Sequence, residues 1–156
     1  MSKAVKDVDH GYTELVKRVF AMGAPDIDVG VLENKGADKA EGDDVRVVDV
    51  ASWAEFGTDT QPERSWLRAF FDEHKEECRN KLADLLKKVI EGTLTEDQAL
   101  EQFGLWAVGQ IQKRIADGIA PENAPSTIEK KGSDKPLIDT GVFRSAISYR
   151  VEKVEK

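Results

Sequence analysis

The segment 45-VRVVDVASWAEFGTDTQPERSWLRAFF-71 decides the fold, because its apolar residues alternate before Gly57 and recur at helical spacing after Pro62. Alternation places one set of side chains on one face of an extended chain, and so predicts a strand over 45–54. The members of that set are Val48, Val50, Ala54 and Phe56. Proline suits the first turn of a helix, since it lacks the N–H that would be unpaired there. We therefore expect strand, turn and helix in this order.

The helix that begins at Pro62 is expected to continue to Glu91, because apolar residues recur every three or four positions throughout 62–91. Gly92 can then adopt the left-handed conformation that ends a helix. A second helix over 95–118 follows, and Thr95 with Gln98 has the form of a capping box. The short connection between these two helices predicts an antiparallel helical hairpin.

Shorter patterns surround the hairpin. Residues 9–22 carry apolar side chains at helical spacing and predict a short N-terminal helix, and 140–145 predicts a single helical turn. Alternating apolar residues predict strands near 26–33 and 146–154, with 45–54 as the antiparallel partner of the first. The fold class is therefore α+β, with a small antiparallel sheet packed against the helical hairpin. We expect a single domain over 1–156, with mobile polar arms near 34–44 and 119–139.

Composition argues against several classes of function. The chain has 156 residues, a net charge of −7 and one cysteine. Proteins that wrap nucleic acid neutralise phosphates with lysine and arginine, so an acidic chain does not suit that role. A single cysteine excludes an internal disulfide, and Cys78 falls on the apolar face of the first long helix. Signal-peptide and membrane-span patterns are missing, so we expect a cytoplasmic protein, unless it leaves inside a larger particle.

The sequence contains no convergent set of catalytic or ligating residues. Its two histidines, His10 and His74, have no Cys or Glu at metal-ligand spacing, and the patterns for phosphate binding or a nucleophile elbow are missing. We expect no enzymatic activity, no cofactor and no metal. His74 follows Phe70 by one turn on the apolar side of the helix, which favours a half-buried histidine over a ligand or base.

The three tryptophans leave two interpretations open. Trp53, Trp66 and Trp106 can belong to the core or can anchor a subunit contact, where tryptophan is enriched. We favour the core for each residue, while expecting at least one of the three to be interfacial.

Three segments together resemble a known group of proteins. They are WAEFGT at 53–58, PERSWLR at 62–68, and KPLIDTG at 135–141 followed by RSAI at 144–147. Their order and spacing are similar to those of the small virion morphogenesis proteins of tailed bacteriophages, which serve as neck, head–tail connector, tail-completion or minor tail components. The chain differs from this family by Ser65 in place of proline, Trp66 in place of phenylalanine and Phe143 in place of leucine. Since serine can cap a helix, Ser65 leaves the helix start open.

The resemblance implies a structural virion protein that forms a homo-oligomeric ring in the phage neck, between the portal and the tail. The implied partners are copies of itself, portal or head-completion proteins, and tail-terminator or tail-tube proteins. DNA would pass through without specific binding, and no membrane is involved. The implied location is the virion, after assembly in the cytoplasm of the bacterial host. An acidic wall suits such a conduit, because it repels the phosphates of DNA.

Residues in and beside the three segments are our candidates for the subunit interface. Arg64 and Arg68 lie four positions apart and cannot pair with each other, so each is expected to reach an acidic group such as Glu55 or Asp139. The full candidate set is Trp53, Glu55, Arg64, Trp66, Arg68, Asp139 and Arg144.

Three other functions stay open. A tail-terminator or tail-completion protein, which caps the tail tube, would differ from a neck protein only in its position. A soluble assembly chaperone or adaptor would bind a partner helix in the groove of the hairpin. A small hydrolase using His74 and a nearby carboxylate would need a pocket around that histidine, and we rank it last.

Overall fold

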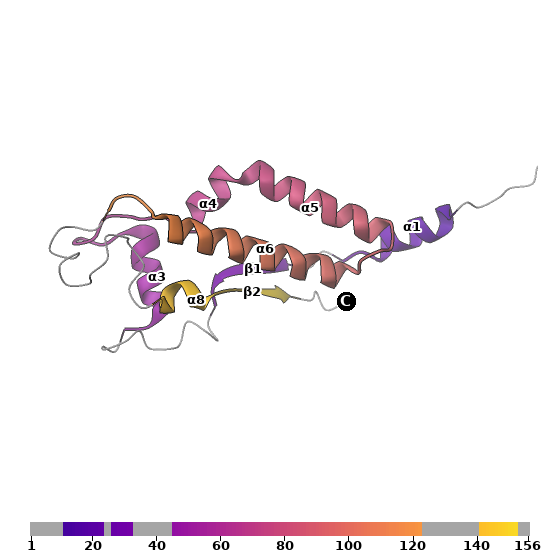
Figure 1. The fold of residues 1–156 in the computed structure, drawn as a ribbon. Helices are drawn as coiled ribbons and strands as arrows, with labels where there is room; N and C mark the ends of the chain where they lie inside the picture. The colour runs from indigo at the N-terminus through magenta and orange to yellow at the C-terminus, as the bar shows by residue number, and fades with distance from the viewer. Residues whose placement is uncertain (1–10, 24–25, 33–44, 123–140, 153–156) are drawn as a thin grey trace, which may run out of the picture.

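The computed structural model describes residues 11–23, 26–32, 45–122 and 141–152. In chain order its elements are α1 (Tyr12–Ala21), β1 (Asp26–Val31), α3 (Val47–Phe56), α4 (Arg68–Glu73), α5 (Lys75–Ile90), α6 (Glu96–Asp117), α8 (Val142–Ala146) and β2 (Ile147–Glu152). The α+β class expected from the sequence is confirmed. Figure 1 shows an elongated molecule in which α6 lies between α5 and the sheet. In the same view α1 extends past the α5–α6 turn, and α3 lies at the opposite end.

Within the described residues the sheet consists of β1 and β2, which pair antiparallel with Asp26 opposite Glu152 and Val31 opposite Ile147. Both strands agree with the sequence prediction, but β1 pairs with the final strand and not with 45–54. Gly104 of α6 lies directly under the ring of Tyr149 on β2, where a Cβ atom would overlap that ring. The missing side chain therefore sets how closely α6 approaches the sheet.

The strand predicted over 45–54 is wrong, because this segment forms the helix α3. The buried apolar residues are Val47, Ala51 and Ala54, whose spacing of four and three is helical. At the start of α3 the Arg46 N–H donates to the Asp49 carboxylate at 3.3 Å, which satisfies an amide that precedes the helix. The alternating valines that predicted a strand are only partly buried.

The single helix predicted over 62–91 is also wrong in its start and its continuity. Residues 61–67 are not helical, and the helix is interrupted at His74, which separates α4 from α5. The His74 Nδ1 atom lies 3.0 Å from the Phe70 carbonyl oxygen, which already accepts the His74 backbone N–H at 2.9 Å. The backbone and side-chain nitrogens of His74 thus both contact the Phe70 carbonyl oxygen at the point where the helix is interrupted.

The second helix and the hairpin are confirmed. Thr95 and Gln98 form the expected capping box at the start of α6, with each side chain accepting the other residue's backbone N–H. Gly92 follows α5 with φ near +78°, as a residue that ends a helix commonly does. The N-terminal helix is confirmed as α1, and the predicted turn near 140–145 as α8, which begins after Gly141.

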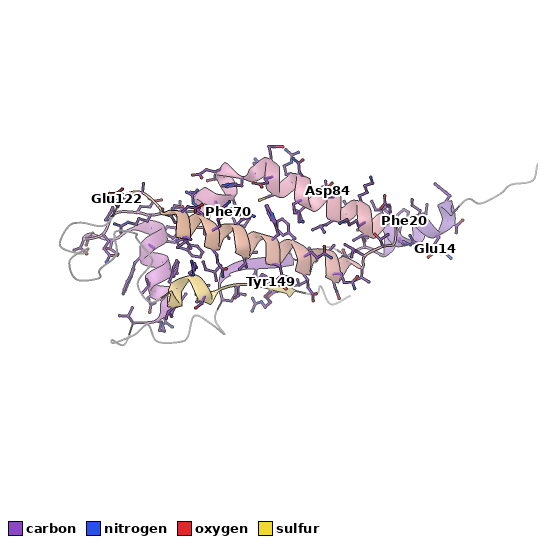
Figure 2. The ribbon with its side chains drawn as sticks, in the orientation of Figure 1. Glu14, Phe20, Phe70, Asp84, Glu122 and Tyr149 are labelled. Atoms are coloured by element: carbon purple, nitrogen blue, oxygen red, sulfur yellow. The ribbon has the colours of Figure 1, made fainter. Side chains whose placement is uncertain are left out.

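The core lies along α6. Its largest fully buried side chains come from three different helices and are Val47, Phe70, Ile111 and Ile115. Figure 2 shows side chains filling the space on both sides of α6, with Phe70 on the α4 side and Tyr149 on the sheet side. Phe20, in contrast, lies out on α1. The predicted arm at 34–44 and most of the arm at 119–139 fall outside the described residues.

Candidate subunit interface

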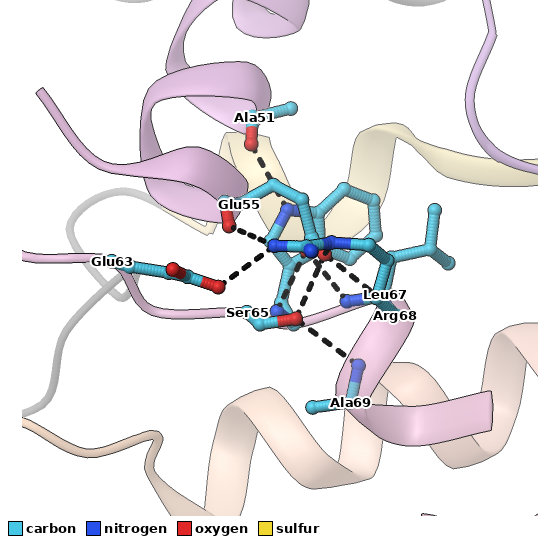
Figure 3. Close-up of polar contacts among 8 residues, drawn as sticks. Ala51, Glu55, Glu63, Ser65, Leu67, Arg68 and Ala69 are labelled. Carbon is cyan, nitrogen blue, oxygen red and sulfur yellow. Dashed lines mark hydrogen bonds and ion pairs between the residues drawn. The ribbon is translucent and has the colours of Figure 1, made fainter. Parts of the chain in front are cut away.

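Glu55, near the end of α3, organises the junction between α3 and α4 (Figure 3). Its side chain is 6% exposed. One carboxylate oxygen, Oε2, accepts the backbone N–H groups of Trp66 and Leu67, both at 2.9 Å. The other, Oε1, accepts Ser65 Oγ at 2.8 Å and two donors of Arg68, its backbone N at 3.1 Å and Nε at 2.9 Å. Five donors therefore converge on one buried carboxylate.

This arrangement explains why the chain becomes helical at Arg68 and not at Pro62. The amides at the start of a helix have no partner within the helix, and here the Glu55 carboxylate of α3 accepts that of Arg68, the first residue of α4, together with those of Trp66 and Leu67 just before it. Burial alone raises the pKa of Glu55, but hydrogen bonds from Leu67, Ser65 and Arg68 outweigh it, so the pKa lies below its ordinary value. The carboxylate is therefore charged when it holds the junction.

Trp66 lies inside the protomer beside this carboxylate. Its side chain is buried, its Nε1 donates to the Ala51 carbonyl oxygen at 3.0 Å, and its ring meets Phe143 of α8 edge-on at 5.2 Å between centroids. The core interpretation thus holds for Trp66. Trp106 is partly buried against the core beside Phe103.

The outer side of the junction carries exposed aromatic residues. Trp53 and Phe56, three positions apart on α3, are 42% and 67% exposed. The Arg68 guanidinium lies over the Phe56 ring at 4.9 Å from its centroid and also donates to Glu63 at 2.7 Å. We call Trp53, Phe56 and Arg68 the aromatic surface. Tryptophan and arginine are the residue types most enriched at the energetic centres of protein interfaces.

The other candidate residues have different places. Arg68 reaches Glu55 as expected, but Arg64 does not: its Nε and Nη2 donate to the carbonyl oxygens of Pro121 and Glu122 at 2.7 and 3.1 Å. Arg64 therefore joins residues 121 and 122, which follow α6, to the α3–α4 junction by hydrogen bonds. Arg144 is exposed on α8, and its carbonyl oxygen accepts Gln112. Asp139 lies outside the described residues.

The described parts of the three segments that carried the resemblance meet at this end of the molecule. Segment 53–58 supplies Glu55, segment 62–68 supplies its donors, and Phe143 lies between the two pieces of the third segment. Sequence reasoning missed the exposure of Phe56, which the strand pattern had placed on the same face as Val48, Val50 and Ala54. A helical period over 47–56 would have predicted this exposure, because Ser52, Trp53 and Phe56, which are all exposed, lie on one side of the helix.

Two residues with chemical potential lie elsewhere. The His74 ring stacks on Phe70 at 4.8 Å between centroids and is partly buried, as expected from its position in the sequence. Cys78 is buried, and burial raises the pKa of its thiol, with the Glu77 carboxylate adding to the effect. A raised thiol pKa disfavours the reactive thiolate.

In the part of the chain that the structure describes, no group of three or more His, Cys, Asp or Glu side chains is placed to hold a metal ion. The same residues include no helix long and apolar enough to cross a bilayer. Comparison of the chain with protein-family models, with curated proteins and with solved structures returned no match.

Proposed function

We propose that this chain is the subunit of a homo-oligomeric ring in the neck of a tailed phage or a phage-derived particle, between portal and tail. The observation that carries the proposal is the aromatic surface, an exposed cluster of interface-forming residues on a rigid junction. The sequence resemblance supplies the phage setting, and the described parts of its three segments lie at this same junction.

The junction suits a subunit contact because its geometry is fixed before assembly. The Glu55 carboxylate accepts the backbone N–H groups of residues 66–68, and the Glu63 carboxylate accepts Nη2 of Arg68 at 2.7 Å. A side chain that is already ordered loses less conformational entropy when a partner binds. The net charge of −7 agrees with a lumen through which DNA passes without binding.

A second candidate function is an assembly chaperone or adaptor. The observation in its favour is that large apolar side chains are exposed on α1 and α3, at opposite ends of the molecule, as a protein that shields a partner transiently requires. Such a protein would leave before the particle matures, whereas a ring subunit stays.

The test has two arms. Mass spectrometry of purified tailed particles from the strain that encodes the chain should find it at a small fixed copy number, as a closed ring requires. Absence from mature particles, together with its presence in assembly intermediates, would favour the chaperone.

The second arm uses point variants and light scattering. Phe56→Ser, on the aromatic surface, should shift the purified protein toward smaller oligomers, whereas Leu105→Ser should not. Leu105 is a matched control, since it is also a large exposed hydrophobic residue but lies on α6. Equal behaviour of both variants would contradict the assignment of the interface.

A further inference from the structure

Helix α1 presents an apolar face that the described residues leave largely uncovered. Its five apolar residues before Ala21 all fall on one side of the helix, at spacings of three and four, and are Tyr12, Leu15, Val16, Val19 and Phe20. Tyr12 and Phe20 are 74% and 85% exposed, and Leu15 and Val19 are also exposed. Figure 2 shows Phe20 at this outlying end of the molecule. We call these five residues the α1 face.

The area of the α1 face is large for one short helix. An aromatic side chain buries about 150–250 Å² when fully covered, so Tyr12 and Phe20 at their exposed fractions leave roughly 240–400 Å² open. That overlaps the roughly 300–600 Å² of the largest apolar patch on a typical monomer, before Leu15 and Val19 are added. A patch of this size indicates a docking surface.

The rest of α1 is attached to the protein body at its C-terminal end. Arg18 Nη1 donates to the Ile90 carbonyl oxygen at the end of α5, and the Gly23 N–H donates to Glu96 at the start of α6, each at 3.2 Å. These contacts hold the helix against the α5–α6 turn while its apolar side chains stay exposed. Helix α1 is therefore fixed at one end and leaves its apolar side chains open to a neighbouring molecule.

Helix α1 cannot reach the aromatic surface of its own chain. Glu96, at the N-terminal end of α6, accepts the N–H of Gly23, two residues past α1, whereas Arg64 of the α3–α4 junction binds Pro121, just past the C-terminal end of α6. The 22 residues of α6 separate these ends by about 33 Å, more than twice the roughly 15 Å length of the ten-residue α1. Figure 1 shows α1 and α3 at opposite ends.

We propose that the α1 face of one copy packs on the aromatic surface of the next copy. This inference rests on the proposed ring, whose subunit contact it completes by naming the segment that covers Trp53 and Phe56. The α1 face is the apolar side of one helix, and Trp53 and Phe56 lie on one side of α3 beside the Arg68 guanidinium, so the two helices can pack against each other. A protomer with different patches at its two ends makes a head-to-tail contact, which closes into a ring when the rotation between copies allows it.

The areas explain why the contact belongs in a ring. At their exposed fractions Trp53 and Phe56 offer roughly 160–270 Å². Even with its rim, such a contact falls below the roughly 800 Å² per partner of a standard stable interface. An isolated pair of copies would be weak, but every copy in a closed ring makes the contact twice, and closure makes the last association intramolecular.

The test is a disulfide between two singly substituted chains. Phe20→Cys and Phe56→Cys proteins are mixed in equal amounts, oxidised and analysed by intact mass, with Phe20→Cys plus Leu105→Cys as the matched control. The native Cys78 is buried, so it does not compete. The expected result is a disulfide-linked Phe20→Cys and Phe56→Cys pair in at least about tenfold excess over the control. Equal yields in both mixtures would overturn the proposal.

Two other outcomes would also overturn it. Predominant linkage of Phe20→Cys to itself would mean that two α1 faces pair symmetrically. Wild-type protein that stays monomeric while its α1 binds phospholipid vesicles would mean that the α1 face covers a membrane surface. The copy number in particles is measured independently, so a normal copy number without the disulfide would refute this contact and leave the neck ring standing.

Discussion

Replacing Glu55 with glutamine tests whether the buried carboxylate holds the α3–α4 junction. Glutamine has nearly the same shape, but its amide nitrogen donates hydrogen bonds and cannot accept them. The less costly orientation puts this nitrogen at the Oε2 position, where it faces the N–H groups of Trp66 and Leu67. Both of those donors lose their acceptor inside the protein.

The magnitude follows from those two lost bonds. A hydrogen bond to a charged acceptor contributes about 1.5–3 kcal/mol, so losing two predicts a loss of roughly 3–6 kcal/mol in the free energy of unfolding. That is a large share of the 5–15 kcal/mol typical of a folded domain. The replacement of charge by a neutral carbonyl oxygen at Arg68 acts in the same direction.

Urea denaturation followed by tryptophan fluorescence measures the effect, because Trp66 packs inside the junction. Glu63→Gln is the matched control, since Glu63 pairs with the same arginine at 2.7 Å but is 55% exposed. Exposed pairs contribute about 0–1 kcal/mol, so this variant should unfold almost as the wild type does. If Glu55→Gln destabilises the protein no more than Glu63→Gln, the carboxylate does not hold the junction and the reasoning fails.

Further predictions concern helix packing, pH and the thiol. In α6, Gly104→Ala should lower the free energy of unfolding by about 1–3 kcal/mol, because the added Cβ meets the Tyr149 ring. Gly109→Ala, with open space around it, should raise that free energy by about 0.5–1 kcal/mol. Thermal unfolding compares the two variants, and equal shifts would contradict the packing of α6 on the sheet. Because the folded-state pKa of Glu55 lies below its ordinary value of 4.5, its stabilisation is complete above that pH and is lost as the pH falls through the folded pKa. Urea midpoints measured from neutral pH down to about pH 3 should therefore fall less steeply in Glu55→Gln than in the wild type, and parallel curves would refute this. Cys78 should react with a thiol reagent only as fast as the protein opens, so its labelling rate should rise when urea is added, and rapid labelling of the native protein would show that it is not buried.

Local signals in the sequence predicted the elements that depend on nearby residues alone. The capping box of Thr95 and Gln98 and the glycine at position 92 act within one turn of a helix, so they predicted the start of α6 and the end of α5. The same holds for the alternation in β1 and β2. The approach of Arg68 to Glu55 was also foreseen, because two arginines four positions apart cannot pair with each other and were expected to reach acidic groups; Arg64 instead binds carbonyl oxygens.

Segment 45–67 shows what local signals could not decide. Val48 and Val50 alternate as in a strand, yet Val47, Ala51 and Ala54 recur as in a helix, and a segment this short satisfies both patterns. The choice depended on what each face meets. The Ala51 carbonyl oxygen accepts the Trp66 side chain and Glu55 accepts the amides before α4, and these contacts join residues 11 to 15 positions apart once α3 is helical.

The sequence by itself therefore determined the α+β class, the helical hairpin, the two strands and the amphipathic character of α1, because periodicity and caps are properties of neighbouring residues. The tertiary structure alone decided which of those apolar faces remain exposed. Periodicity shows that a helix has an apolar side, but not whether its own chain covers that side. The exposure of the α1 face and the aromatic surface follows from the tertiary structure, in which the length of α6 separates them to opposite ends of the protein.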